Sequence, residues 1–229
     1  MKIIDAHSHI DCITHLFQPD VVGSVCCAEN ESQWSRLLNM DNIYPAFGIH
    51  PWFIDSLEKG YEERLYELLK THPLFMVGEI GLDKYHPNMD IQMNVFIKQL
   101  EIAIKLKRTV FLHCVGAWDK ILHILKQYKK SELPIIVAHA FNANDNVCNE
   151  LLKYEKIFFS FNKIDKPREI HRIEQIPSKK ILVETDGKFN IILTDVINKI
   201  TSIKNDKNIP DIIYDNTLRI LNGTQTASD

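Results

Sequence analysis

The chain opens with MKIIDAHSHID (1–11), in which two apolar residues run into an alternating polar segment. Ile3 and Ile4 are typical of a buried strand, and the residues after them keep the two-residue period of that strand. Side chains two residues apart in a strand point to the same face, so we expect His7 and His9 to project together. Two imidazoles on one face either bind a metal ion or belong to a polar strand end. The rest of the sequence decides between these two interpretations.

The same design, an apolar run that ends in polar residues, recurs along the 229 residues of the chain. The strand-like runs are IIDAH (3–7), VGSVCCA (22–28), YPAFGIH (44–50), FMVGEIG (75–81), TVFLH (109–113), IIVAHA (135–140), IFFSF (157–161) and ILVETD (181–186). Between them, apolar residues three and four apart predict helices over residues 61–70, 93–107, 118–128 and 145–154. Strands and helices that alternate at intervals of about 20 to 35 residues predict an α/β fold, a TIM-type (β/α)8 barrel. An open doubly wound sheet would alternate in the same way.

Composition favours a single domain. Hydrophobic residues make up 45% of the chain, which is enough for a substantial core. No internal repeat, Gly/Pro-rich linker or charge block divides the sequence, so one barrel is expected over residues 1–222. The last residues, 223–229, are small and polar and are predicted to form a disordered tail.

Charge and cysteine content restrict the partners and the location. The formal net charge of −3 excludes the global basic balance of many nucleic-acid binders, although bound metal ions could supply positive charge to a phosphate substrate locally. Five scattered cysteines without a C-x-x-C pair indicate a reduced chain rather than a disulfide framework. No apolar run approaches the roughly 18 residues of a membrane helix, so no membrane partner is expected. No signal peptide is recognised before the first strand, and a cytoplasmic location is predicted.

Side chains that can bind metal ions stand where these strand-like runs end. They are His7, His9, His50, Glu79, His113, His139 and Asp186. The carboxyl ends of the strands in a parallel barrel meet at one rim, so these residues are expected to converge there. Each alone could be a satisfied histidine, a helix N-cap or a loop carboxylate, but five of the ten histidines share this position. The others, His15, His72, His86, His123 and His171, are expected to have ordinary core or surface roles.

The types of ligand in this cluster indicate divalent ions. Imidazole and carboxylate groups suit Zn²⁺ or Mn²⁺, with Mg²⁺ as a third candidate. The ligands are too many for one open catalytic ion, so two ions about 3.5–4 Å apart are predicted. Glu79 is the candidate for a carboxylate that bridges them. Gly78 and Gly81 flank it, and glycine permits close backbone approach at a crowded rim.

Several of these stretches resemble motifs of the TatD-type metal-dependent hydrolases, a deoxyribonuclease-containing branch of the amidohydrolase-like barrels. The similar stretches are DAHSHID (5–11), FGIHPW (47–52), VGEIGLDKY (77–85), LHCVGAWDKILHILK (112–126), AHAF (138–141), ILVETD (181–186) and DNTLRIL (215–221). The resemblance covers nearly the whole chain, and VGEIGLD is its most specific motif. It implies a metal-dependent hydrolase that cleaves phosphodiester bonds, with single-stranded or terminal DNA as the substrate.

The resemblance also implies a role for individual residues. One ion would be held by His7, His9, Glu79 and Asp186, and the second by Glu79, His113 and His139. Water activated between the ions would be the nucleophile, with Asp186 as its general base. His50 would contact substrate phosphate rather than metal. Asp5 and Glu184 each lie two residues before a proposed ligand. They would orient the ligands without binding the metal themselves.

Other stretches depart from the pattern of the family and weaken the inherited substrate pocket. Family members commonly follow the fifth-strand histidine with a Ser-Arg pair, whose arginine can bind phosphate, but here Cys114 and Val115 follow His113. The loop after the eighth strand is also shortened. We therefore retain two alternatives, an amidohydrolase-type enzyme that cleaves a C–N, lactone or ester bond, and a metal-binding interaction protein without catalysis.

Basic and aromatic residues remain near the expected rim. We hypothesise that Lys163 or Lys188 replaces the missing arginine as a phosphate contact, whereas the plainer interpretation of both is a solvated loop. Trp52, which follows His50 and Pro51, either stacks on a nucleobase or packs on its own loop.

Overall fold

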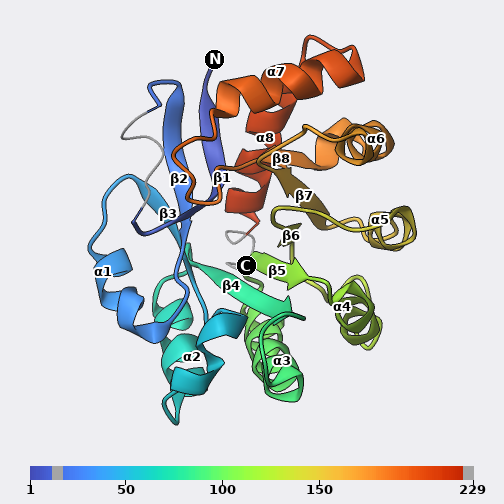
Figure 1. Ribbon diagram of the computed structural model, residues 1–229. Coiled ribbons are helices and arrows are strands. Elements are labelled where there is room, and N and C mark those ends of the chain that lie inside the picture. The colour runs from blue at the N-terminus through green and yellow to red at the C-terminus, as the bar shows by residue number, and fades with distance from the viewer. Residues whose placement is uncertain (12–17, 224–229) are drawn as a thin grey trace.

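The computed structural model describes residues 1–11 and 18–223, and these residues form one sheet of eight parallel strands. The strands are β1 (Ile3–His9), β2 (Val21–Cys27), β3 (Ile43–Phe47), β4 (Met76–Asp83), β5 (Val110–Val115), β6 (Ile136–Ala138), β7 (Ile157–Phe161) and β8 (Ile181–Val183). Each strand is hydrogen-bonded to the next in the sequence. The first and last strands also lie in contact, and the Asp186 N–H donates to the His7 carbonyl at 3.0 Å. The sheet thus nearly closes into a barrel, which confirms the predicted TIM-type fold (Figure 1).

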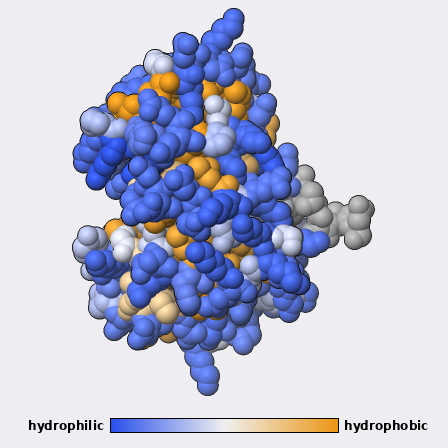
Figure 2. Space-filling model, turned by 90° about the vertical axis from the view of Figure 1, so that its right-hand side faces the viewer, coloured by the Kyte–Doolittle hydropathy of each residue, from blue (hydrophilic) through white to orange (hydrophobic). Residues whose placement is uncertain are grey.

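Helices surround the sheet (Figure 1). They are α1 (Trp34–Leu38), α2 (Tyr61–Thr71), α3 (Met89–Leu106), α4 (Trp118–Leu125), α5 (Asp145–Leu152), α6 (Pro167–Gln175), α7 (Leu193–Lys204) and α8 (Ile209–Asn222), with short 3₁₀ helices η2 (Glu31–Gln33), η3 (Pro51–Ser56) and η4 (Ser178–Lys180). The predicted helical segments correspond to α2, α3, α4 and α5. Their apolar faces pack on the sheet, and the outer surface over α4 to α6 is largely hydrophilic (Figure 2).

Apolar side chains fill the interior of the barrel. Two residues of α8, Ile220 and Leu221, belong to this interior cluster. The strands contribute the rest: Ile4, Ala6, Val25, Cys27, Ala46, Met76, Phe111, Val137, Phe158 and Leu182. The hydroxyl of Thr109, just before β5, donates to the Ile220 carbonyl at 2.8 Å. Helix α8 therefore closes the amino end of the barrel, and the polar strand ends lie at the opposite, carboxyl end.

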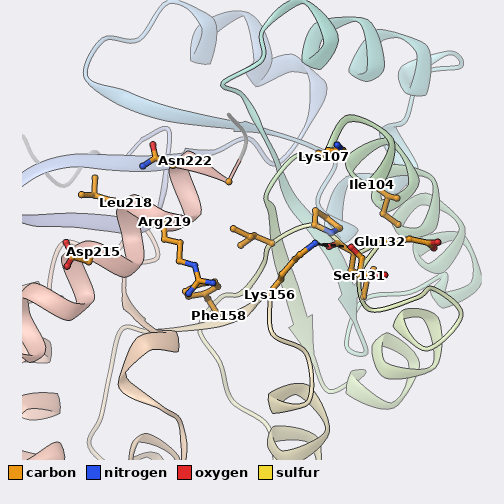
Figure 3. A pocket seen from close by; sticks show the side chains of 14 residues that line it. Ile104, Lys107, Ser131, Glu132, Lys156, Phe158, Asp215, Leu218, Arg219 and Asn222 are labelled. Atoms are coloured by element: carbon orange, nitrogen blue, oxygen red, sulfur yellow. Dashed lines mark hydrogen bonds between the residues drawn. The ribbon is translucent and has the colours of Figure 1, made fainter. Parts of the chain in front are cut away.

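A cavity of about 890 Å³ lies on the amino-end side of the barrel, where β6 and β7 begin beside α8 (Figure 3). Phe158 and Leu218 give it apolar walls, and the Arg219 guanidinium lies 5.5 Å from the centre of the Phe158 ring. This cavity is separate from the polar rim, because none of its lining residues belongs to the strand ends that carry the predicted ligands.

Several further predictions concern the chain as a whole. The described cysteines Cys26, Cys27, Cys114 and Cys148 are free thiols, as predicted. No helix within the described ranges has the length and apolar character needed to cross a membrane. Cys12 and His15 lie outside the described residues, as does the predicted tail from residue 224 onward. The assignment of residues 1–222 to one domain remains a prediction.

Candidate metal centre

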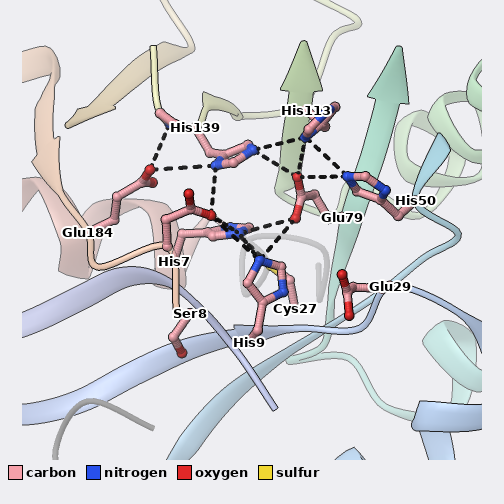
Figure 4. Close-up of polar contacts among 12 residues, drawn as sticks. His7, Ser8, His9, Cys27, Glu29, His50, Glu79, His113, His139 and Glu184 are labelled. Atoms are coloured by element: carbon pink, nitrogen blue, oxygen red, sulfur yellow. Dashed lines mark hydrogen bonds and ion pairs between the residues drawn. The ribbon is translucent and has the colours of Figure 1, made fainter. Parts of the chain in front are cut away.

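One half of the candidate site surrounds the Oε2 atom of Glu79, near the middle of β4 (Figure 4). His7 Nε2 lies 3.2 Å from this oxygen and His9 Nε2 lies 3.6 Å from it. The two imidazole nitrogens are 3.4 Å apart, so the histidines do project together from β1. Asp186 completes this half, with Oδ1 3.5 Å from His9 Nε2 and 3.9 Å from His7 Nε2.

The other half surrounds the Oε1 atom of the same carboxylate. His113 Nδ1, from β5, and His139 Nε2, after β6, each lie 2.7 Å from Oε1. His50 Nε2 lies 3.5 Å from Oε1 and 3.1 Å from His113 Nδ1, and its side chain is buried. His50 was predicted to contact phosphate, and its position makes it a candidate metal ligand as well. The structure thus brings together all seven residues that the strand ends placed at the rim.

The donor atoms fit divalent ions on both sides of Glu79. Three groups of ligand atoms lie within 4.8 Å of one another: His7, Glu79 and His139; His7, His9 and Asp186; His50, Glu79 and His113. Oε2 of Glu79 is buried and has no hydrogen-bond partner, although imidazole nitrogens surround it. A buried carboxylate oxygen without a hydrogen bond is unfavourable, and a cation at this point would satisfy it.

Electrostatics favour charged carboxylates at the centre. Burial opposes ionisation of Glu79, but the facing imidazoles outweigh it and hold the pKa of Glu79 well below its usual value. Burial likewise opposes ionisation of Asp186, yet its hydrogen bond with His9 and the charge of His139 hold its pKa low. The pKa of His139 is raised well above its usual value, because the charge of Glu79 and the hydrogen bond with Glu184 overcome the effect of burial. A bound metal ion would displace a proton from this imidazole, since only neutral histidine ligates metal.

Asp5 and Glu184 support the loops that carry the ligands. The Asp5 carboxylate accepts hydrogen bonds from the backbone N–H of Thr185 at 2.9 Å and from its hydroxyl at 2.6 Å, and so fixes the residue before Asp186. Glu184 Oε1 lies 3.5 Å from His139 Nδ1 and accepts the backbone N–H that follows His139 at 2.7 Å. This geometry agrees with the orienting role that was predicted for both residues.

The backbone around the ligands is strained or crowded. Asp186 and Ala140 have φ angles of 54° and 42°, in the left-handed region that costs non-glycine residues about 1–3 kcal/mol. A Cβ on Gly81 would lie 1.8 Å from the His113 carbonyl oxygen, and one on Gly78 would lie 2.7 Å from the Cβ of Phe111. Both glycines are therefore required by close packing, as their sequence positions indicated.

Sequence reasoning missed two residues beside the ligands. Asp83 lies four residues after Glu79 and therefore on the same face of β4, a spacing that could have revealed it. Its Oδ2 accepts the indole N–H of Trp52 at 2.7 Å and lies 3.5 Å from His113 Nε2. Cys27 ends β2, and its Sγ lies 3.4 Å from Nδ1 of His7. Burial raises the pKa of Cys27 well above its usual value, so this thiol stays neutral beside the ligand.

The predicted substrate-binding residues occupy different parts of the rim. Trp52 lies in η3 and lines the small site cavity of about 190 Å³, with 51% of its surface exposed. Lys188 forms an ion pair with Oδ2 of Asp186 and so reaches the site. Lys163 pairs with Asp165 at 3.1 Å and, like Lys188, lines a neighbouring cleft of about 470 Å³.

Comparison with known proteins identifies the family. The family model described as "TatD related DNase" matches residues 4–220 of this chain. The chain belongs to this family. Its resemblance to the TatD-type hydrolases is thereby confirmed over almost the entire described structure.

Individual relatives agree with the assignment. The human "3'-5' RNA nuclease TATDN2" is 31% identical over 166 residues, which cover 68% of this chain but only 21% of that protein. The "3'-5' ssDNA/RNA exonuclease TatD" of Escherichia fergusonii is 27% identical over 207 residues, or 86% of this chain and 78% of the relative. Among solved structures, the TatD homologue YJJV from Escherichia coli K12 superimposes with a TM-score of 0.84 at 22% identity, covering 96% of this chain and 98% of the other. This likeness confirms the barrel.

Proposed function

We propose that this protein is a divalent-metal-dependent hydrolase that cleaves phosphodiester bonds in single-stranded or terminal nucleic acid. One observation carries the proposal: each oxygen of the buried Glu79 carboxylate faces its own set of imidazole nitrogens. Family membership and the named nuclease activities of the TatD and TATDN2 relatives support the choice of phosphodiesters.

Two ions would be held by the chain, with Zn²⁺, Mn²⁺ and Mg²⁺ as candidates. The first would bind His7, His9, Glu79 and Asp186, and the second would bind Glu79, His113 and His139, with His50 near enough to join them. Such ions supply positive charge that stabilises a developing phosphoryl anion and lowers the pKa of an attacking water. The bridging position of Glu79 makes it the residue on which both halves depend.

Asp186 is the proposed general base. Its Oδ2 is held by the ammonium group of Lys188, whereas its Oδ1 faces His7 and His9. Oδ1 is thus the oxygen available to accept a proton from the attacking water. Lys188 keeps the carboxylate ionised and fixes its orientation, because it occupies the other oxygen.

The substrate is proposed to be a strand end or a short single strand. The net charge of −3 disfavours the many phosphate contacts through which a protein grips a duplex. Positive charge on the rim is local: Lys188 lies at Asp186, and Lys163 lies in the adjoining cleft. Either lysine could contact a phosphate next to the scissile one.

A second candidate function is hydrolysis of a C–N, lactone or ester bond. Cys114 and Val115 line the site cavity where the family pattern has a Ser-Arg pair, so no arginine follows His113. An uncharged wall at this point would also accept a neutral substrate.

The test is cleavage of a 3′-labelled single-stranded oligonucleotide with added Mn²⁺, with Glu79→Gln compared with the wild type. Glu67→Gln is the matched control, because Glu67 lies on the surface of α2, where it pairs with Lys70. We expect the wild type and the control to cleave, and Glu79→Gln to lose activity by about 1000-fold or more. Cleavage by Glu79→Gln at the wild-type rate would contradict the proposal. A folded wild type that hydrolyses a lactone or amide but no phosphodiester would favour the second candidate.

A further inference from the structure

Exposed aromatic side chains gather at the rim that carries the metal centre. Within residues 1–11 and 18–223, the most exposed aromatic side chains are Tyr44, at the start of β3, and Trp52, Tyr85 and Phe189. The last three, at 51%, 82% and 65%, follow the carboxyl ends of β3, β4 and β8. Exposed apolar surface gathered in one region, rather than scattered, marks an interaction site. Large aromatic rings at a catalytic rim therefore point to a substrate with flat apolar parts.

A single carboxylate holds the ring of Trp52 and the backbone of Tyr85. Asp83 accepts the indole N–H of Trp52 through Oδ2 at 2.7 Å and the backbone N–H of Tyr85 through Oδ1 at 2.9 Å. This carboxylate therefore links the loop after β3 to the loop after β4.

The loop that carries Tyr85 is also held by a buried residue of α3. Gln92, fully buried in α3, accepts the Asp83 N–H at 2.8 Å. Its amide group donates to the carbonyls of Asp83 at 3.1 Å, His86 at 3.0 Å and Pro87 at 3.0 Å. A surface that is rigid before binding loses little conformational entropy on binding, which favours its use as a contact site.

The wall beside Trp52 is apolar and close to the ligands. Trp52 shares the site cavity with Cys114 and Val115 at the end of β5. Its ring centre lies 6.3 Å from that of His113 and 5.0 Å from that of His50. A flat group bound on this wall would thus be a direct neighbour of a phosphate at the metal centre.

The cleft beside β7 and β8 carries several ammonium groups. Lys163, Lys188 and Lys199 line it, together with the Asp165 and Asp195 carboxylates. On the side of Trp52, Glu29 lines the site cavity and Asp83 accepts the indole N–H. We expect phosphates next to the scissile one to contact the lysines, while an uncharged base lies against Trp52.

We propose that Trp52 is a stacking platform for a nucleobase next to the scissile phosphate, with Tyr85 as a second aromatic surface. Asp83 is the positioning residue for the Trp52 ring and for the backbone of the loop that carries Tyr85. The proposal rests on the proposed function and adds to it a base-binding surface for a single strand, whose bases are free to leave a stack. A duplex does not present bases in this way.

The test compares two strands of equal length, an oligothymidylate and an oligomer made entirely of abasic tetrahydrofuran units. The quantity measured is kcat/KM on the normal strand divided by kcat/KM on the abasic strand, with Mn²⁺ present. We expect Trp52→Ala to lower this ratio by about 5- to 150-fold, since stacking on an aromatic side chain contributes about 1–3 kcal/mol per base. Trp52→Phe keeps a ring and should retain much of the ratio. Tyr44→Ala removes an exposed ring at the start of β3 and should leave the ratio unchanged.

The outcomes are distinguishable. A ratio that stays at the wild-type value in Trp52→Ala, with activity lost equally on both strands, would overturn the proposal and make Trp52 a support for the metal centre alone. If Trp52→Ala does not fold, Tyr85→Ala provides the second arm, because this ring is 82% exposed; an unchanged ratio there would overturn the proposal too. A wild type that cleaves neither strand would instead contradict the proposed nuclease function.

Discussion

At the amino end of the barrel, the buried side chains of Lys180 and Asn216 are hydrogen-bonded to backbone carbonyls, whereas at the carboxyl end two buried atoms of the candidate metal ligands have no hydrogen bond. The Lys180 ammonium, before β8, donates to the carbonyls of Tyr154, Glu155 and Ile157 at 2.7–3.1 Å. The Asn216 amide in α8 donates to two further carbonyls at 2.8 Å. At the carboxyl end, the buried atoms Glu79 Oε2 and His9 Nδ1 have no hydrogen-bond partner.

Residues that stabilise the fold and residues that serve the function therefore lie at opposite ends of the barrel. At the amino end, Lys180 and Asn216 follow the rule that buried polar groups are satisfied, and α8 closes this end with apolar side chains. The carboxyl end breaks the rule at the residues that can bind metal, and its backbone is strained at Asp186 and Ala140. We therefore expect substitutions at the carboxyl end to remove activity without unfolding the protein, and substitutions at the amino end to do the reverse.

The largest expected effect is that of Asp186→Asn. The amide keeps the shape of the carboxylate but cannot accept a proton from the attacking water, so kcat should fall by about 10²- to 10⁴-fold. The thermal unfolding midpoint should change little. Activity on the labelled oligonucleotide tests the first statement, and circular dichroism on the same sample tests the second. A variant that unfolds at the temperature of the assay would contradict the division of stability and function between the two ends.

The next effect is expected from Ile220→Ala at the amino end. Ile220 is fully buried in the barrel interior, and its loss should lower the free energy of unfolding by about 2–5 kcal/mol. Below the unfolding transition, kcat should remain at the wild-type value. Urea denaturation measures the first quantity, and Leu74→Ala, at a side chain that is 60% exposed, is the control. A change in kcat with unchanged stability would contradict the division between the two ends.

The smallest expected effect is a pH dependence of the free energy of unfolding that arises in a helix around the barrel. Burial raises the pKa of Cys148, in α5, from 9.0 to about 11. Between these values the unfolded chain loses a proton that the folded chain keeps, so the free energy of unfolding should fall as pH rises. The slope from one thiol is at most about 1.4 kcal/mol per pH unit. Urea denaturation in the presence of a reductant should show a shallower decline for Cys148→Ala than for the wild type, and parallel curves would exclude this contribution.

Much of the fold and the site could be predicted, because the strands, the helices and most of the candidate ligands follow local patterns of the sequence. The strands coincide with apolar runs of the sequence, and His7, Glu79 and His113 lie in β1, β4 and β5, where barrel geometry makes such residues converge. Strands β3, β6 and β8 end earlier than predicted, so His50, His139 and Asp186 lie in the loops that follow.

The parts that were missed depend on contacts between distant segments. Asp83 becomes important because Trp52 reaches it from another loop, 31 residues away in the sequence. His50 approaches His113 across the barrel, which its own strand does not reveal. The apolar residues of α8 close the amino end because Ile220 and Leu221 join the cluster of strand side chains inside the barrel, a tertiary relation that helical periodicity does not contain.

The most direct test of this account is the number of metal ions per chain. Purified protein loaded with Mn²⁺ or Zn²⁺ and then desalted should contain close to two ions by elemental analysis. Anomalous diffraction should place one ion on each side of the Glu79 carboxylate. A single ion bound by all the histidines, or none in a folded chain, would contradict the division of the site between the two oxygens of Glu79.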